Sequence, residues 1–134
     1  MPHTFVIDAK KNSLNGGTPL NTGITVGPGD LLTVSVPSDD TWSAGAANRT
    51  SNANGLGNPL GGNFGTFAKG PFQFLYGSLV GTLDGGNTYF AVGTRLEMSI
   101  QVKGKLELVY WDINNNDNTE SVIATIEVYK GPQP

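Results

Sequence analysis

The chain has 134 residues, which is enough for one domain with its own hydrophobic core. It has no cysteine, so disulfides, thiolate metal sites and cysteine nucleophiles are excluded. Its formal net charge is −3 and its few basic residues form no cluster, which argues against a nucleic-acid-binding protein, since such a protein needs a basic face for phosphates.

No stretch approaches the roughly 18 apolar residues of a membrane span. The first eight residues also lack the basic region and apolar run of a secretory signal. We see no signal peptide, and the sequence leaves open a cytoplasmic location or release from the cell by a non-classical route.

Short alternating or β-branched runs, separated by Gly, Pro and Asn turns, predict eight strands in chain order. They cover residues 4–8, 18–26, 31–36, 74–83, 88–92, 95–102, 105–110 and 122–129. No segment of useful length has a helical period. We therefore predict an all-β chain, an antiparallel β-sandwich of the jelly-roll or galactose-binding-domain-like type, with residues 1–134 forming a single domain.

Residues 43–70 show no hydrophobic period and are rich in Gly and Asn. A loop of this length inside a compact domain is usually functional or disordered. Two readings stay open: a floppy insertion, or a binding loop that its aromatic residues hold against the body.

Residues 110–121 form the most polar loop of the chain, between two strand-like runs that we expect to pair as a hairpin. The loop carries Asp112, Asn114, Asn115, Asp117 and Asn118. Carboxylate, carboxamide and carbonyl oxygens are the ligands that Ca²⁺ prefers. The same residue types are also ordinary turn formers, so a plain turn is the competing interpretation.

The spacing of this loop begins like an EF-hand but does not continue as one. Asp117 stands where an EF-hand requires Gly, and Ile123 stands where it requires the bidentate Glu. The predicted flanks are strands rather than helices. A calcium site here would therefore be of another kind.

Catalytic signatures are missing from the sequence. The one histidine, His3, lies at the N-terminus, and no nucleophile-elbow or phosphate-loop motif is present. Carboxylates on the predicted strands occupy alternating positions that face solvent. We expect a protein that is not an enzyme, with a glycan-active enzyme as the weakest alternative.

The order of several motifs resembles the LecA-type bacterial lectins, a family of calcium-dependent, galactose-binding β-sandwich proteins. A G-x-L-V-G strand is followed by an F-x-V-G turn, a G-x-L-x-L-x-x-x-D strand and an acidic loop that closes with D-N. The matching segments are residues 29–34, 41–43, 77–83, 90–93, 104–112 and 117–122. The resemblance runs over most of residues 27–129.

The resemblance implies a Ca²⁺ cofactor and a set of ligands for it. In this sequence the implied ligands are Asp112, a carbonyl near Asn114 or Asn115, the side chains of Asp117 and Asn118, and a carbonyl near Gly45. It also implies that a sugar is held through two neighbouring hydroxyls on the metal, with Asp112, Asp117 and Asn118 bonding the same hydroxyls.

The sugar contacts of the family's galactose binders include a His and a Gln from the long loop after the Trp. The corresponding loop here contains no His. It offers Asn48, Arg49 and Asn52 instead, with Trp42 at its entrance, and these four residues are the further candidates for sugar binding. For Trp42 a place in the core is the stronger interpretation.

The leading hypothesis is therefore a calcium-dependent carbohydrate-binding lectin, with galactosides as the first ligands to consider. Its partners would be a carbohydrate and further copies of the chain in a dimer or tetramer, because lectins gain avidity from several weak sites. The alternative is a non-catalytic structural or interaction domain of the same fold that binds calcium or no ligand.

Overall fold

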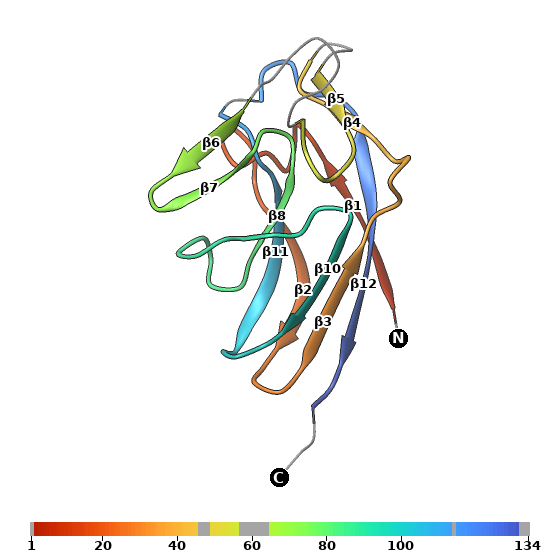
Figure 1. Ribbon diagram of the computed structural model, residues 1–134, viewed down its shortest axis with the longest axis vertical. Helices are drawn as coiled ribbons and strands as arrows, with labels where there is room; N and C mark the ends of the chain where they lie inside the picture. The colour runs from red at the N-terminus through yellow and green to blue at the C-terminus, as the bar shows by residue number, and fades with distance from the viewer. Residues whose placement is uncertain (1, 46–48, 57–64, 114, 132–134) are drawn as a thin grey trace.

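The computed structural model describes residues 2–45, 49–56, 65–113 and 115–131 and consists of β-strands and their connections (Figure 1). Within these ranges the strands are β1 (His3–Asp8), β2 (Leu20–Val26), β3 (Leu31–Ser35), β4 (Trp42–Ser43), β5 (Thr50–Ser51), β6 (Thr66–Lys69), β7 (Phe72–Leu75), β8 (Leu79–Thr82), β9 (Phe90–Ala91), β10 (Arg95–Ser99), β11 (Gly104–Tyr110) and β12 (Ser121–Tyr129). The all-β prediction is confirmed. In this described part of the chain, no helix has the length and apolar character needed to cross a membrane.

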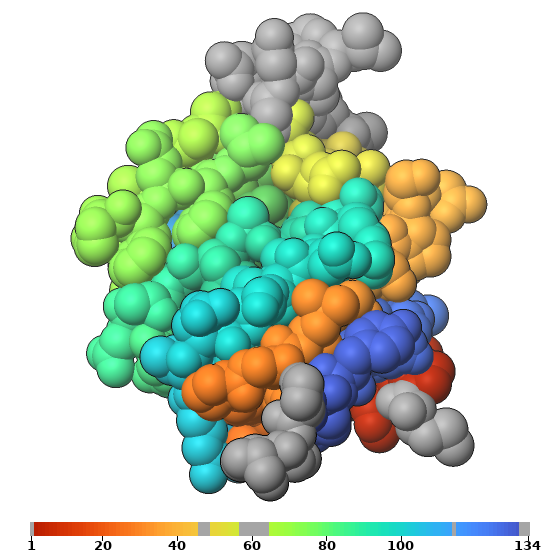
Figure 2. Space-filling view, turned by 60° about the horizontal axis from the view of Figure 1, so that its bottom comes forward, coloured from red at the N-terminus to blue at the C-terminus, as the bar shows by residue number. Residues whose placement is uncertain are grey.

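Two four-stranded antiparallel sheets make up the sandwich, with strand orders β1-β12-β3-β10 and β2-β11-β8-β9. In the oblique view of Figure 2, β1, β12, β3 and β10 of the first sheet lie side by side as red, blue, orange and blue-green bands. The inward residues of both sheets form the main core, and Leu32, Leu106 and Ile126 are fully buried there. Each such side chain contributes about 1.5–3 kcal/mol by leaving water.

The predicted hairpin between residues 105–110 and 122–129 is wrong. β11 and β12 belong to different sheets, and residues 111–120 cross from one sheet to the other at the top of the view in Figure 1. The alternation of each strand reports which face is buried but carries no information on the strand with which it pairs. The polar loop is therefore a crossover at the end of the sandwich.

Two further differences concern the middle of the chain. The predicted strand 74–83 is two strands, β7 and β8, separated by a turn at residues 76–78. Residues 43–70, predicted to lack strands, include β5 and β6. Together with β4, which was also not expected, these short strands and the division of 74–83 explain why the described chain exceeds the eight strands expected.

The β6–β7 hairpin covers the outer face of the second sheet. Trp111, Val80 and Val109 are fully buried beneath it in a second cluster that includes Phe67 and Phe74. The indole N–H of Trp111 donates to the carbonyl of Phe67 at 2.7 Å. The hairpin thus fixes the end of β11, from which the polar loop departs.

Candidate functional site

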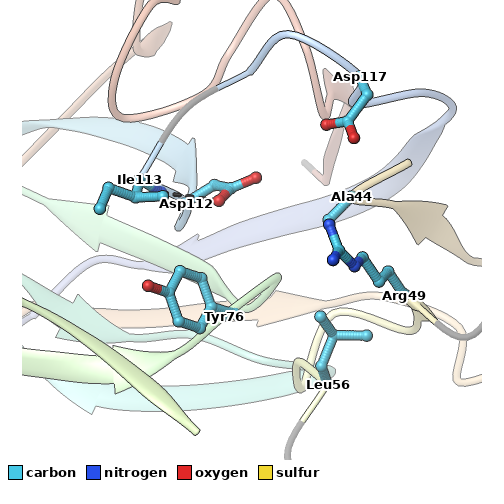
Figure 3. Close-up of a pocket in the computed structure, with 7 residues that line it drawn as sticks. All are labelled: Ala44, Arg49, Leu56, Tyr76, Asp112, Ile113 and Asp117. Carbon is cyan, nitrogen blue, oxygen red and sulfur yellow. Dashed lines mark hydrogen bonds between the residues drawn. The ribbon is translucent and has the colours of Figure 1, made fainter. Parts of the chain in front are cut away.

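A pocket of about 210 Å³ lies where the polar loop meets the segment after Trp42 and the turn before β8. It is lined by Ala44, Arg49, Leu56, Tyr76, Asp112, Ile113 and Asp117 (Figure 3). Two carboxylates and a guanidinium supply its polar part, and Leu56, Tyr76 and Ile113 supply its apolar part. The pocket is large enough for one small polar ligand.

Asp112 is placed at the pocket by backbone bonds between Trp111 and the turn before β8. The amide of Gly77 donates to the carbonyl of Trp111 at 2.8 Å, and the amide of Trp111 donates to the carbonyl of Ser78 at 3.0 Å. The carboxylate accepts a bond from the amide of Ile113 at 2.7 Å. Asp112 is buried, so its charge has limited contact with water.

Asp117 and Gly45 lie against each other, although the sequence separates them widely. Ser43 and Thr119 exchange two backbone hydrogen bonds of 3.0 Å, which draw the segment after Trp42 to the polar loop. A Cβ atom added to Gly45 would lie 2.6 Å from Cγ of Asp117, and Gly45 has a φ of +121°. Only glycine therefore allows this close approach.

The side chain of Asn118 joins the polar loop to Ala9, the residue after β1, and its Oδ1 atom has no hydrogen-bond partner among the described residues. Its Nδ2 donates to the carbonyl of Ala9 at 2.9 Å, and its amide donates to the carbonyl of Asn115 at 3.2 Å. The residue is 2% exposed, yet its Oδ1 has no hydrogen-bond partner in the described structure. A buried oxygen in this condition is costly unless something binds it.

Tyr110 lies close enough to both carboxylates for their charges to act on its hydroxyl. Its ring packs edge-to-face on Trp42 at 4.5 Å between centroids, beneath the pocket. Burial raises the pKa of the Tyr110 hydroxyl well above its usual value, and the charges of Asp112 and Asp117 raise it further. The hydroxyl therefore remains protonated and carries no negative charge of its own.

The residues fit a calcium ion in their chemistry. Asp112, Asp117, the unpartnered Oδ1 of Asn118 and nearby carbonyl oxygens are hard ligands of the type that Ca²⁺ takes. In the described part of the chain, no three His, Cys, Asp or Glu side chains gather as a metal-binding group. A calcium shell does not require three carboxylates, since carboxamide and carbonyl oxygens complete it.

Some predicted site residues have other roles. Trp42 is fully buried and its indole N–H donates to the carbonyl of Gly77 at 2.8 Å, so the prediction that it contacts sugar is corrected. Asn52 does not line the pocket. Its carboxamide donates to the carbonyl of Ser38 at 3.2 Å and accepts from the amide of Asn54 at 2.9 Å, so the structure gives it a role in the turn, and its contact with sugar stays an untested prediction.

The side chain and the backbone carbonyl of Asn115 have different roles. Its side chain donates to the carbonyl of Lys10 at 3.0 Å and packs against Gly16, so only its backbone carbonyl remains as a candidate ligand. Arg49 lines the pocket, and its role in sugar binding stays a prediction. Asn48 and Asn114 lie outside the described residues.

The sequence analysis did not identify the apolar residues Leu56 and Tyr76 that line the pocket. Leu56 and Tyr76 are brought together by the amide of Leu56, which donates to the carbonyl of Tyr76 at 2.7 Å. The Tyr76 ring stacks on Phe67 at 5.9 Å with an interplanar angle of 21°. The sequence signal for this turn is Gly77, since a glycine inside an apolar run often interrupts a strand. In the structure Gly77 has a φ of +77°.

Comparison with known proteins supports the fold. A solved structure described as "EclA N-terminal domain; PllA-like lectin" matches with a TM-score of 0.66 and 21% sequence identity, over 94% of this chain and 93% of that chain. The likeness shows a shared β-sandwich fold. No protein-family model matches the chain, and a search of curated proteins finds no match.

Proposed function

We propose that this protein is a calcium-dependent lectin, similar to the LecA type, that binds a carbohydrate in the pocket beside Asp112 and Asp117. The observation that carries the proposal is that Asp112 and Asp117 line one pocket of a sandwich whose fold matches that of a lectin domain. Asn118, the neighbour of Asp117 in the chain, adds a buried Oδ1 without a hydrogen-bond partner in the described part of the chain. The motif order in the sequence supports the same assignment.

Different side chains of the pocket would hold the metal, bond the sugar hydroxyls and contact the sugar ring. Asp112 and Asp117 would hold a Ca²⁺ ion, and such an ion would supply coordination for two neighbouring sugar hydroxyls. Asp112 and Asp117 accept hydrogen bonds from the same hydroxyls. Tyr76 and Ile113 offer apolar surface for the C–H face of a pyranose ring. All of these are binding roles, so we propose no reaction.

The test is a glycan array probed with the wild-type chain in calcium and in chelator, together with Asp112→Asn. We expect calcium-dependent binding to one group of glycans, with galactosides included in the array, and loss of that binding in the variant. Binding that persists in chelator would contradict the calcium mechanism. Calcium binding without any glycan binding would favour the structural or interaction domain.

We also propose that the chain assembles as a dimer or tetramer of identical copies. β1 pairs only with β12 in the described structure, so its other edge is open. Val6 on β1 and Ile123 on β12 face each other in register and are 56% and 50% exposed. Such an apolar pair beside an open strand edge suits contact with a second copy.

Light scattering tests this assembly. We expect the wild-type mass to be at least twice that of one chain at micromolar concentration, and Val6→Lys to lower it. A monomeric wild-type mass would contradict the proposal.

A further inference from the structure

We infer that the pocket prefers a negatively charged saccharide, with a uronic acid carboxylate or a sulfate group, and that Arg49 selects it. The inference rests on the proposed function, because it concerns the ligand of the same pocket. It begins from the composition of the lining: Arg49 is the one Lys or Arg among the described lining residues.

The position of Arg49 is fixed by its backbone. Its carbonyl accepts a hydrogen bond from the amide of Ala44 at 2.9 Å, and the next residue, Thr50, pairs with Ser43 across β4 and β5. Figure 3 shows the side chain extending into the space below Asp117 and facing Asp112. The guanidinium therefore belongs to the same pocket as the two carboxylates.

The charges explain why this ligand should be an anion. The ionised lining groups are two carboxylates and one guanidinium, which give a net negative charge of one. A divalent cation on the carboxylates reverses that sign and leaves a net positive charge of one, because a bound metal is the largest local charge in such a site. An acidic saccharide then meets an attractive field only when calcium is present.

The shape of the arginine side chain also favours an acidic saccharide over a neutral one. A guanidinium is a planar fork that donates two parallel hydrogen bonds to a carboxylate or sulfate group. A neutral hydroxyl can use only one arm of the fork at a time. Leu56 and Tyr76 line the same pocket, so the sugar ring can lie on apolar surface while its acidic substituent faces Arg49.

The experiment compares matched neutral and acidic sugars by isothermal titration calorimetry in calcium. The probes are methyl galactoside with methyl galacturonide, methyl glucoside with methyl glucuronide, and galactose 6-sulfate. We expect the acidic member of the bound pair to bind roughly tenfold more tightly, the magnitude of one charge-assisted pair at an open pocket. The sulfate probe shows whether a planar or a tetrahedral anion fits better, and either result supports an acidic ligand.

The variant Arg49→Gln should remove the preference, so that the neutral and acidic members of a pair bind with the same affinity. The matched control is Arg95→Gln, the same substitution on the outer face of β10, where Arg95 pairs with Glu97 at 3.5 Å. The control should keep the preference. A preference that survives in Arg49→Gln, or a wild-type chain that binds both members equally, would overturn the inference.

Calcium titration without sugar gives an independent readout. Removing one positive charge from the pocket should raise calcium affinity by roughly three- to tenfold in Arg49→Gln and leave it unchanged in Arg95→Gln. Unchanged affinity in both variants would place the guanidinium too far from the metal to share its ligand, and would refute the inference. Calcium-dependent binding of neutral sugars alone refutes only this inference, whereas no binding of any sugar refutes the proposed function as well.

Discussion

Replacing Asn118 with Ala separates the two roles that its carboxamide has in the structure. The Nδ2 group donates to the carbonyl of Ala9 at 2.9 Å, and both residues are buried. The substitution leaves that carbonyl without this donor, which costs about 2 kcal/mol. For a domain of this size the expected fall in Tm is roughly 6–10 °C.

The same substitution removes Oδ1, the buried oxygen without a partner. Calcium that binds only the folded chain stabilises it by about 2.7 kcal/mol when its concentration is one hundred times Kd. We expect the wild type to gain this increment and Asn118→Ala to lose it. Differential scanning calorimetry in calcium and in chelator measures both effects on the same samples.

Asn115→Ala is the matched control. Its Nδ2 donates to the carbonyl of Lys10 at 3.0 Å, one residue further along the same turn, and its side chain points away from the pocket. This variant should lose about 1 kcal/mol and keep the whole calcium increment. An increment that persists in Asn118→Ala, or one that disappears equally in Asn115→Ala, would refute the reasoning.

Three other substitutions test separate parts of the structure. Trp42→Ala removes a fully buried side chain and should cost about 4 kcal/mol in urea unfolding, whereas a loss below about 1 kcal/mol would contradict its place in the core. Gly45→Ala places a Cβ 2.6 Å from Cγ of Asp117 at a φ of +121°, so we expect the calcium increment in Tm to shrink, and an unchanged increment would separate this glycine from the site. Hydrogen bonds from backbone N–H groups, that of Gly131 first, lower the pKa of Asp30. The stability that this carboxylate contributes is therefore fully present above a pH of about 4 and is lost as the pH falls through its folded-state pKa. Asp30→Asn should flatten the fall in Tm below that pH, and parallel curves of Tm against pH for the variant and the wild type would contradict this.

The alternation of apolar and polar residues predicted the strands wherever one face of the strand is buried and the other is exposed to solvent. β12 shows this alternation along residues 121–126 and was expected within one residue of its observed start. β8 does not alternate, because all of its four residues are buried between the main core and the β6–β7 hairpin. Its apolar run therefore merged with β7 in the prediction, and the turn that holds Tyr76 was lost.

Site residues were predictable where the chemistry of a side chain restricts its use. Asp112 and Asp117 are acidic residues in a polar loop, and the structure brings both to one pocket. Trp42 and Asn52 are different, because an aromatic ring serves a core as well as a sugar, and a carboxamide serves a turn as well as a ligand. Composition cannot separate these uses, and only the observed contacts with Gly77 and Ser38 do so.

The crossover loop owes its shape to segments distant in sequence. Thr119 is held by Ser43, and the side chain of Asn118 is held by Ala9. These bonds lie within the protein, so a ligand that enters the pocket need not order the loop backbone, and little of its binding energy is spent on conformational entropy. If the pocket binds sugar as proposed, discrimination between sugars falls to the side chains around the opening, above all Arg49 and Tyr76, which belong to other segments. Changes at these positions should therefore alter which sugar binds without removing the calcium increment, whereas changes to Asp112, Asp117 or Asn118 should remove both.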